Sequence, residues 1–231
     1  MLTNTTCQTD MWVKINCVLN IMRILKGRNP GDLYYEEYLK KVERCGAAFY
    51  DIYVAMWELG STVAPKRILE VGTRTGISLC QLLSSYRDLS VIERIVSIDP
   101  YDGYTSPNLV KANLRALNLL PDSFNGKLEF RVGKSQDELP NLIADGAEFD
   151  YILIDGDHTK SVAAEDLHMA RKLLAPNGVI LFDDISDFPG ECSLIDVWQE
   201  FVAQNPELKH YENMQGKGTA LAKLVAIGGA C

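Results

Sequence analysis

Residues 67–76 read Arg-Ile-Leu-Glu-Val-Gly-Thr-Arg-Thr-Gly, and this stretch decides the fold. Its apolar start predicts a buried strand. Gly72 and Gly76 then predict a tight turn, because glycine tolerates unusual backbone conformations and lets a ligand approach closely. A similar pattern recurs downstream, where short apolar runs alternate with longer amphipathic stretches. Nearly continuous apolar strands between helices are typical of a parallel sheet with both faces covered. We therefore predict a doubly wound α/β fold with a mostly parallel, seven-stranded sheet.

The predicted strands follow one another along the chain. Five strands form the parallel part, at residues 67–71, 94–98, 128–132, 151–154 and 179–182. After a helix around residues 193–204, two shorter β-like runs near residues 209–212 and 220–226 complete the sheet. Ligands of open α/β sheets bind at the carboxyl ends of the strands. The residues at those ends are therefore the candidates for function.

The chain divides near residue 62 in this interpretation. Residues 1–62 form a helical extension, with one helix over residues 11–25 and two more between residues 32 and 59, interrupted near Gly46; residues 63–231 form the α/β domain. The first helix carries an apolar stripe that the domain or a second subunit must cover. The stripe consists of Met11, Ile15, Val18, Leu19, Met22 and Leu25. Because symmetric dimers are the commonest soluble assembly, we expect a homodimer with this helix at or near the interface. A role as a lid over the site is the alternative.

Composition and charge exclude several partners. The 231 residues carry 23 Lys+Arg and 31 Asp+Glu, a formal net charge of −8. Nucleic-acid binding through phosphate neutralisation needs a basic surface, so we expect no such partner. Six cysteines without a C-x-x-C pair indicate reduced thiols. The apolar stretch at residues 11–25 contains charges and is shorter than the roughly 20 residues that span a bilayer. We expect a cytoplasmic protein that acts on a small molecule, without membrane contact.

The sequence matches neither of two common nucleotide-binding motifs. The turn after the first strand reads G-T-R-T-G, with Arg74 in the place of the middle glycine of a dinucleotide fingerprint. Residues 133–135 read G-K-S like the end of a P-loop, but the first glycine of that motif would fall at Leu128. Glu70, before the glycines, favours a ligand with positive charge over a phosphate. Asp99, at the end of the second strand, can accept two hydrogen bonds from a ribose diol.

Together these motifs resemble the class I S-adenosylmethionine-dependent methyltransferases, and in particular the metal-dependent catechol O-methyltransferase group. The resemblance covers roughly residues 65–185 and rests on five motifs in order at strand ends: residues 70–76, Asp99, and residues 132–142, 152–158 and 179–184. The departures are Arg74, an insertion at residues 101–108 and the N-terminal region, which matches nothing in the group. These departures affect the expected substrate more than the expected cofactor.

The resemblance implies a binding site for S-adenosylmethionine. Glu70 would bind the methionine amino end or support the loop, and Asp99 would hold the ribose hydroxyls. Ser135 and Gln136 would lie beside the adenine, although a role as a helix cap is an equal alternative for this pair. The full expected set of cofactor-binding residues is Glu70, Gly72, Thr73, Gly76, Asp99, Ser135, Gln136 and Asp155.

Three carboxylates fall at the ends of two strands that should be neighbours. Asp155 follows one strand, and Asp183 and Asp184 follow the other. Like charges packed together are costly unless a cation or shared protons offset the repulsion. Oxygen ligands favour a hard divalent ion such as magnesium, manganese or calcium. The alternative is that Asp184 caps the next segment and Asp155 orders a turn. Asp157 is a weaker fourth candidate.

His158 follows Asp155 by three residues, where the catechol-type enzymes carry a catalytic lysine. An imidazole can remove a hydroxyl proton at neutral pH, so we expect His158 and Asp155 to be catalytic. The alternative for His158 is an ordinary hydrogen-bonded side chain. A metal that binds substrate hydroxyls lowers their pKa and fixes the direction of attack. This favours acceptors with adjacent oxygens, such as catechols, hydroxylated natural products or sugar diols.

Other classes of protein remain open at this point. They are a metal-free methyltransferase that acts on another nucleophile, a nicotinamide-dependent oxidoreductase and a non-catalytic subunit. Four aromatic residues are candidates for the wall of the substrate pocket, or for ordinary packing: Tyr101, Tyr104, Phe188 and Trp198.

Overall fold

A seven-stranded sheet lies at the centre of the computed structural model, which describes residues 4–28, 33–45, 51–103, 105–186, 193–214 and 218–224. The strand order is β3-β2-β1-β4-β5-β7-β6, and β7 alone runs antiparallel to both of its neighbours. The strands are β1 (Arg67–Val71), β2 (Arg94–Asp99), β3 (Leu128–Val132), β4 (Phe149–Ile154), β5 (Leu174–Asp183), β6 (Leu208–Asn213) and β7 (Thr219–Leu224). The predicted doubly wound, mostly parallel sheet is confirmed.

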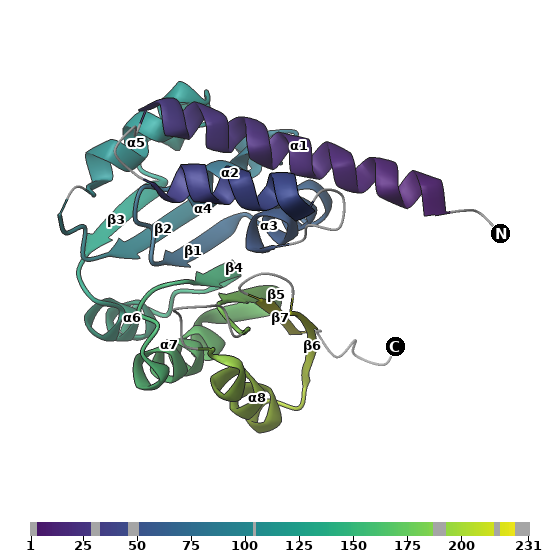
Figure 1. The fold of residues 1–231 in the computed structure, drawn as a ribbon. Helices are drawn as coiled ribbons and strands as arrows, with labels where there is room; N and C mark the ends of the chain where they lie inside the picture. Colours follow the sequence, from purple (N-terminus) through teal and green to yellow (C-terminus); the bar gives the residue numbers. More distant parts are fainter. Residues whose placement is uncertain are drawn as a thin grey trace, which may run out of the picture.

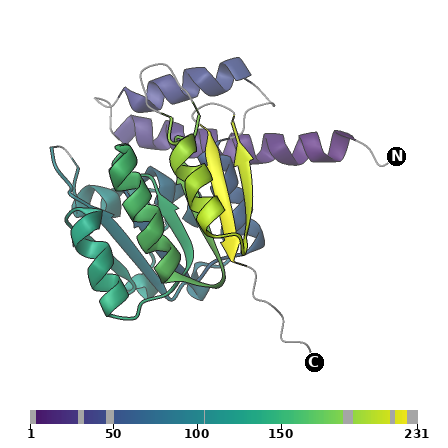
Figure 2. The same cartoon turned by 90° about the horizontal axis from the view of Figure 1, so that it is seen from below.

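Helices cover both faces of the sheet (Figure 1). One face carries α1 (Asn4–Arg28), α2 (Tyr34–Cys45), α3 (Ile52–Thr62), α4 (Ile77–Ser84) and α5 (Pro107–Ala116). The other face carries α6 (Ser135–Ala144), α7 (Lys160–Leu173) and α8 (Ile195–Gln204), which lie in front of the sheet in Figure 2. Short 3-10 turns at Leu89–Val91 and Asp122–Phe124 lead into β2 and β3.

The central strands contribute side chains to two hydrophobic cores, one on each face of the sheet. Ile68 of β1 packs toward α1–α5, whereas its neighbour Leu69 packs toward α6–α8. The same alternation runs along β4, where Tyr151 and Ile152 point to opposite cores. Because both faces are covered, no position of these strands has to be polar, and this explains the unbroken apolar runs in the sequence.

The largest difference from the predicted strands concerns β5. It begins at Leu174, five residues before the predicted start, directly where α7 ends. Leu174 pairs with Phe149 of β4, and a register shift separates this pair from the regular ladder that begins at Tyr151 and Val179. The intervening Pro-Asn-Gly sequence is typical of a turn, so the early pairing was not predicted.

The apolar stripe of α1 is covered within the chain itself. Ile15, Val18, Leu19, Met22 and Leu25 are each at most 6% exposed and belong to the core between the sheet and α1–α5. The helix contacts α2, α3 and α4, and Figure 1 shows it crossing above them. The side chain of Met11 lies outside the described residues. The sequence allowed either the domain or a second subunit to cover the stripe, and in the structure the domain covers it. The predicted homodimer loses this support and stays a prediction.

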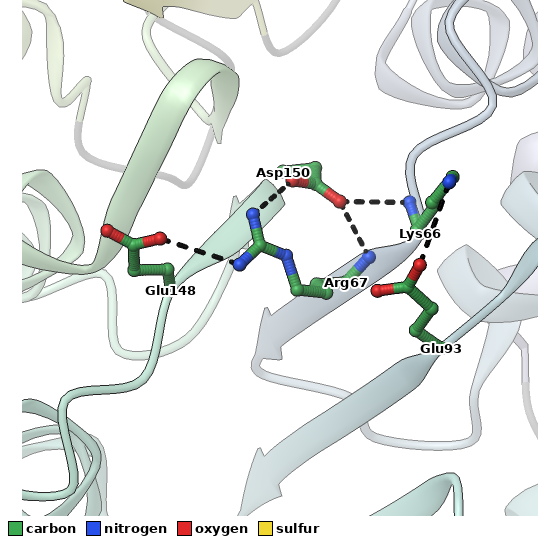
Figure 3. A network of polar contacts seen from close by, with 5 residues as sticks. All are labelled: Lys66, Arg67, Glu93, Glu148 and Asp150. Atoms are coloured by element: carbon green, nitrogen blue, oxygen red, sulfur yellow. Dashed lines mark hydrogen bonds and ion pairs between the residues drawn. The ribbon is translucent and has the colours of Figure 1, made fainter.

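A polar network joins β1 to β4 at the amino ends of these strands (Figure 3). Arg67 Nη2 lies 2.7 Å from Asp150 Oδ1, and Asp150 Oδ2 accepts hydrogen bonds from the backbone N–H groups of Lys66 and Arg67 at 3.1 and 2.9 Å. Partial burial raises the pKa of Asp150, but the bonds from Arg67 and Lys66 outweigh it and hold that pKa below its usual value. The network stabilises the end of the sheet that is opposite the functional candidates.

No described helix is long and apolar enough to cross a membrane.

Candidate active site

A cavity of about 720 Å³ opens at the carboxyl ends of the parallel strands. The loops after β1, β2, β3 and β4 line it, together with Asp183 at the end of β5. Two residues of the N-terminal helices, Tyr34 of α2 and Tyr53 of α3, complete the wall. The cavity lies at the strand ends where the sequence predicted the site, and part of the predicted extension belongs to its lining.

Gly72 and Gly76 have positive φ angles of 89° and 81°, and both positions exclude a side chain. A Cβ atom on Gly72 would lie 1.9 Å from the carbonyl oxygen of Asp155, so the loops after β1 and β4 are in direct contact. A Cβ atom on Gly76 would lie 2.7 Å from Val110 Cγ1 of α5. Packing of neighbouring elements alone is enough to require these glycines. Gly72 also lines the cavity, where its missing side chain leaves space.

Glu70 is buried beneath the glycine turn. Its carboxylate accepts a hydrogen bond from the Ser78 hydroxyl in the first turn of α4, and the side chain is 1% exposed. Burial raises the pKa of Glu70 to about 7, although hydrogen bonds from Ser78 and Thr73 act in the opposite direction. The Thr73 hydroxyl is in turn 2.7 Å from Ser97 Oγ of β2. The resemblance allowed two roles for Glu70, and these contacts agree with the second role, in which Glu70 supports the loop.

Asp99 ends β2 and lies at the edge of the cavity. One carboxylate oxygen accepts a hydrogen bond from the backbone N–H of Arg74 at 2.7 Å, and the other from that of Tyr101 at 2.6 Å. Each oxygen of a carboxylate can accept a second bond, so both remain available to a diol in the cavity. The position matches the predicted contact with ribose.

Ser135 and Gln136 begin α6 and line the cavity beside Lys134. The helix is capped at Lys134 without a side-chain hydrogen bond, and the Ser135 hydroxyl lies 3.3 Å from Gln136 Oε1. No side-chain hydrogen bond supports the alternative interpretation of this pair as a helix cap. The Ser135 side chain also interacts with Asp166, and the predicted contact with adenine stays a prediction.

Three side chains form a group whose ligand atoms all lie within 4.8 Å of one another: Asp155, His158 and Asp184. His158 Nδ1 is 2.8 Å from Asp184 Oδ2, and His158 Nε2 is 3.9 Å from Asp155 Oδ1. Asp184 is buried and has a positive φ of 60°, so the chain turns sharply at the end of β5. The two carboxylates suit a hard divalent ion such as magnesium or manganese, whereas the imidazole favours a softer one.

Asp183 and Asp157 stand apart from this group in the described part of the chain. Asp183 lines the cavity next to it, with the Thr219 hydroxyl of β7 at 3.4 Å from Oδ1. Asp157 also lines the cavity, but its carboxylate accepts hydrogen bonds from the side chain and from the backbone N–H of Thr159, which lower its pKa. The structure thus groups two of the three predicted carboxylates and adds His158, which the sequence suggested as a base.

The aromatic wall differs from the expected one. Trp198 of α8 is fully buried against Phe182 of β5, and Tyr101 packs against Phe130 of β3. Tyr104 and Phe188 lie outside the described residues. The cavity is instead lined by Tyr34 and Tyr53, whose hydroxyl oxygens are 2.9 Å apart. The sequence signal for them was the group of tyrosines around α2, in the region for which the resemblance offered no match.

A parallel sheet with this strand order, a glycine turn after β1, an acid at the end of β2 and a cavity above them define a class I methyltransferase. More narrowly, residues 69–185 match a family described as a methyltransferase domain (Methyltransf_24), and the chain belongs to this family. No curated protein matches the sequence.

Solved O-methyltransferases share the fold at low sequence identity. A putative enzyme from Klebsiella pneumoniae is 21% identical with a TM-score of 0.58, over 88% of this chain and 95% of that one. An enzyme from Bacillus cereus in complex with S-adenosylhomocysteine is 21% identical, with a TM-score of 0.56 over 84% and 91%. TomG from Streptomyces achromogenes, in complex with S-adenosylmethionine, is 22% identical, with a TM-score of 0.56 over 74% and 78%.

Proposed function

We propose that this methyltransferase transfers the methyl group of S-adenosylmethionine to a hydroxyl of a small molecule with adjacent oxygens, assisted by a divalent metal. The observation that carries the proposal is the group of Asp155, His158 and Asp184 beside the glycine turn. A Cβ atom on Gly72 would touch the Asp155 backbone, so a cofactor on that turn and an acceptor at the carboxylates would be neighbours. Methyl transfer requires such closeness of donor and nucleophile.

The cofactor assignment is supported by the contacts of Asp99 and by the charge of the cavity. A sulfonium cation with an ammonium group is attracted by an acid-rich site. Gly72, Thr73 and Gly76 would shape the turn, with Glu70 beneath it. Ser135 and Gln136 would flank the adenine at the other end of the cavity. The Bacillus cereus and Streptomyces structures hold the product and the cofactor of this reaction.

Calorimetry tests this assignment directly. S-adenosylhomocysteine should bind, and Asp99→Ala should weaken binding by about 1–3 kcal/mol, the usual cost of leaving a buried polar group without its partner. Asp122→Ala, at an exposed position away from the cavity, serves as the control and should leave the affinity unchanged. An affinity that is equal in all three proteins would exclude Asp99 from the site.

The residues fit a divalent metal, which would be held by Asp155 and Asp184, with Asp183 or His158 within reach. A bound metal of this kind lowers the pKa of a substrate hydroxyl. Asp155 would also face the cofactor, since its backbone contacts Gly72. His158 Nε2 faces Asp155, and in this proposal it removes the proton from the acceptor hydroxyl while Asp184 orients the ring through Nδ1.

A chelator distinguishes this proposal from a metal-free reaction. With a catechol as acceptor, we expect activity to disappear in EDTA and to return with magnesium or manganese. We expect His158→Ala to lower kcat by about 10²–10⁴-fold, the usual contribution of a general base. Calorimetric titration of the same variant with manganese separates the two roles, because a base can be removed without loss of metal affinity and a ligand cannot.

A metal-free methyltransferase is the second candidate. It is favoured by the 2.8 Å contact between His158 and Asp184, because a histidine paired with a carboxylate can accept a proton without a metal. Full turnover in excess EDTA would establish this alternative.

A further inference from the structure

Arg74 occupies an unusual position in the glycine turn. It has a φ of 50°, which residues with a Cβ atom rarely adopt. Its backbone N–H donates to Asp99 and its side chain lines the cavity, with the guanidinium carbon 5.3 Å from the ring centroid of Tyr34. Such backbone conformations persist where surrounding contacts hold them, and they gather at ligand sites. We propose that Arg74 binds a carboxylate group inside the cavity.

The acidic lining of the cavity restricts where an anion can bind. Five acidic residues line it: Asp99, Asp102, Asp155, Asp157 and Asp183. A carboxylate would be repelled along most of this wall. Three basic residues line it as well: Arg74, Lys134 and His158. Lys134 lies next to Ser135 at the proposed adenine end, and His158 lies between Asp155 and Asp184.

The side chain of Arg74 is also suited to the task. A guanidinium offers a planar pair of N–H donors that matches the two oxygens of a carboxylate. The Tyr34 ring attracts the cation from one side and so limits its orientation. Tyr34 is itself held by the hydroxyl of Tyr53, 2.9 Å away. Thus α2 and α3 hold the arginine in place above the turn before a ligand arrives.

Two molecules can supply the carboxylate, and this inference rests on the proposed function. One is the cofactor, whose methionine end carries a carboxylate. The other is an acidic acceptor, because Tyr34, which contacts Arg74, lines the same cavity as Asp155 of the proposed metal group. The chemistry at Arg74 is the same in both cases. The experiment must therefore vary each carboxylate separately.

Calorimetry with matched ligands makes this separation. The cofactor arm compares S-adenosylhomocysteine with its decarboxylated form, S-adenosyl-3-thiopropylamine, which keeps the amine. The acceptor arm compares 3,4-dihydroxybenzoate with catechol, each added to protein saturated with S-adenosylhomocysteine. Both arms use the wild type, Arg74→Gln and Arg74→Lys. Arg87→Gln is the control, since Arg87 is exposed and does not line the cavity.

If Arg74 binds the cofactor, Arg74→Gln should weaken S-adenosylhomocysteine by about 10- to 100-fold and leave the decarboxylated form unchanged, with partial retention in Arg74→Lys. If it binds the acceptor, Arg74→Gln should abolish a preference for dihydroxybenzoate over catechol and leave cofactor affinity intact. A variant that changes neither pair of affinities would overturn the inference. Absence of S-adenosylhomocysteine binding to the wild type would instead refute the proposed function.

Discussion

Glu70 makes the stability of the protein depend on pH in a predictable direction. Its pKa in the folded state is about 7, above the usual 4.5, so the folded protein binds this proton more tightly than the unfolded chain does. The stability that the neutral carboxyl contributes is complete below about pH 4.5 and is lost as the pH rises through 7. Glu70→Gln keeps a neutral group at this position at every pH.

We therefore expect Glu70→Gln to gain stability relative to the wild type as the pH rises, by up to about 3 kcal/mol between pH 4.5 and 7. Urea unfolding of both proteins at several pH values measures the difference, and changes shared by both proteins cancel. A difference in unfolding free energy that is constant with pH would show that Glu70 is already ionised in the folded protein.

The candidate site was only partly predictable at the level of single residues. Asp155, Asp183 and Asp184 could be predicted to lie near one another, and Asp99 to lie at the same edge, because each ends or follows a parallel strand. The grouping of His158 with Asp155 and Asp184 depends on a sharp turn with positive φ at Asp184. A positive φ is usually signalled in a sequence by glycine, and here the residue is an aspartate. The turn could therefore not be predicted from the sequence.

At the level of elements, α1 is an integral part of the core. We expect Met22→Ala, which removes a fully buried side chain, to lower the unfolding free energy by about 2–5 kcal/mol. Ile24→Ala on the same helix is the control, because Ile24 is 45% exposed and should cost far less. Urea unfolding measures both. Equal effects of the two substitutions would indicate that α1 is detached in solution.

The link between β1 and β4 offers a second test among the elements. Asp150→Asn removes the ion pair with Arg67, and we expect a loss of about 1 kcal/mol at neutral pH because the pair is partly screened by solvent. The pKa of Asp150 is lowered in the folded state, so its contribution is present above the usual value of 3.8 and disappears as the pH falls through the folded value.

Urea unfolding at neutral and acidic pH checks this expectation. Glu148→Gln is the matched control, since Glu148 is 3.5 Å from Arg67 and its side chain is 53% exposed. S-adenosylhomocysteine affinity should not change, because the network lies at the amino ends of the strands. A larger loss of stability at acidic pH than at neutral pH would contradict the assignment.

The strands were more predictable than the partners of the helices. An apolar run buried on both faces looks the same whatever covers it, so β1 and β2 could be located from the sequence alone. The stripe of α1 identified a buried face but not what buries it, because a domain and a second subunit present the same apolar surface. Only the fold shows that α2, α3 and α4 provide the contact.

For the whole molecule, the cavity predicts how ligands change thermal stability. Its wall includes residues from α2 to β5, so a ligand that fills it stabilises most of the chain at once. At a concentration about 100 times its Kd, S-adenosylhomocysteine should add about 2.7 kcal/mol and raise Tm by roughly 5–10 °C. NAD should produce no shift, because the turn lacks the dinucleotide fingerprint. A shift with NAD alone would show that the turn accepts a dinucleotide without this fingerprint.

The place of β7 between β5 and β6 has a consequence for synthesis of the protein. A chain emerges from the ribosome amino end first, so β6 leaves before the strand that joins it to the sheet. Until residues 219–224 follow, β6 lacks the strand with which it pairs, since within the described residues its ladder is with β7. The same late strand brings Thr219 to Asp183 at the edge of the cavity. A ribosome that stops before Thr219 therefore releases a chain that lacks two strands of its sheet, although only the last of them is missing from its sequence.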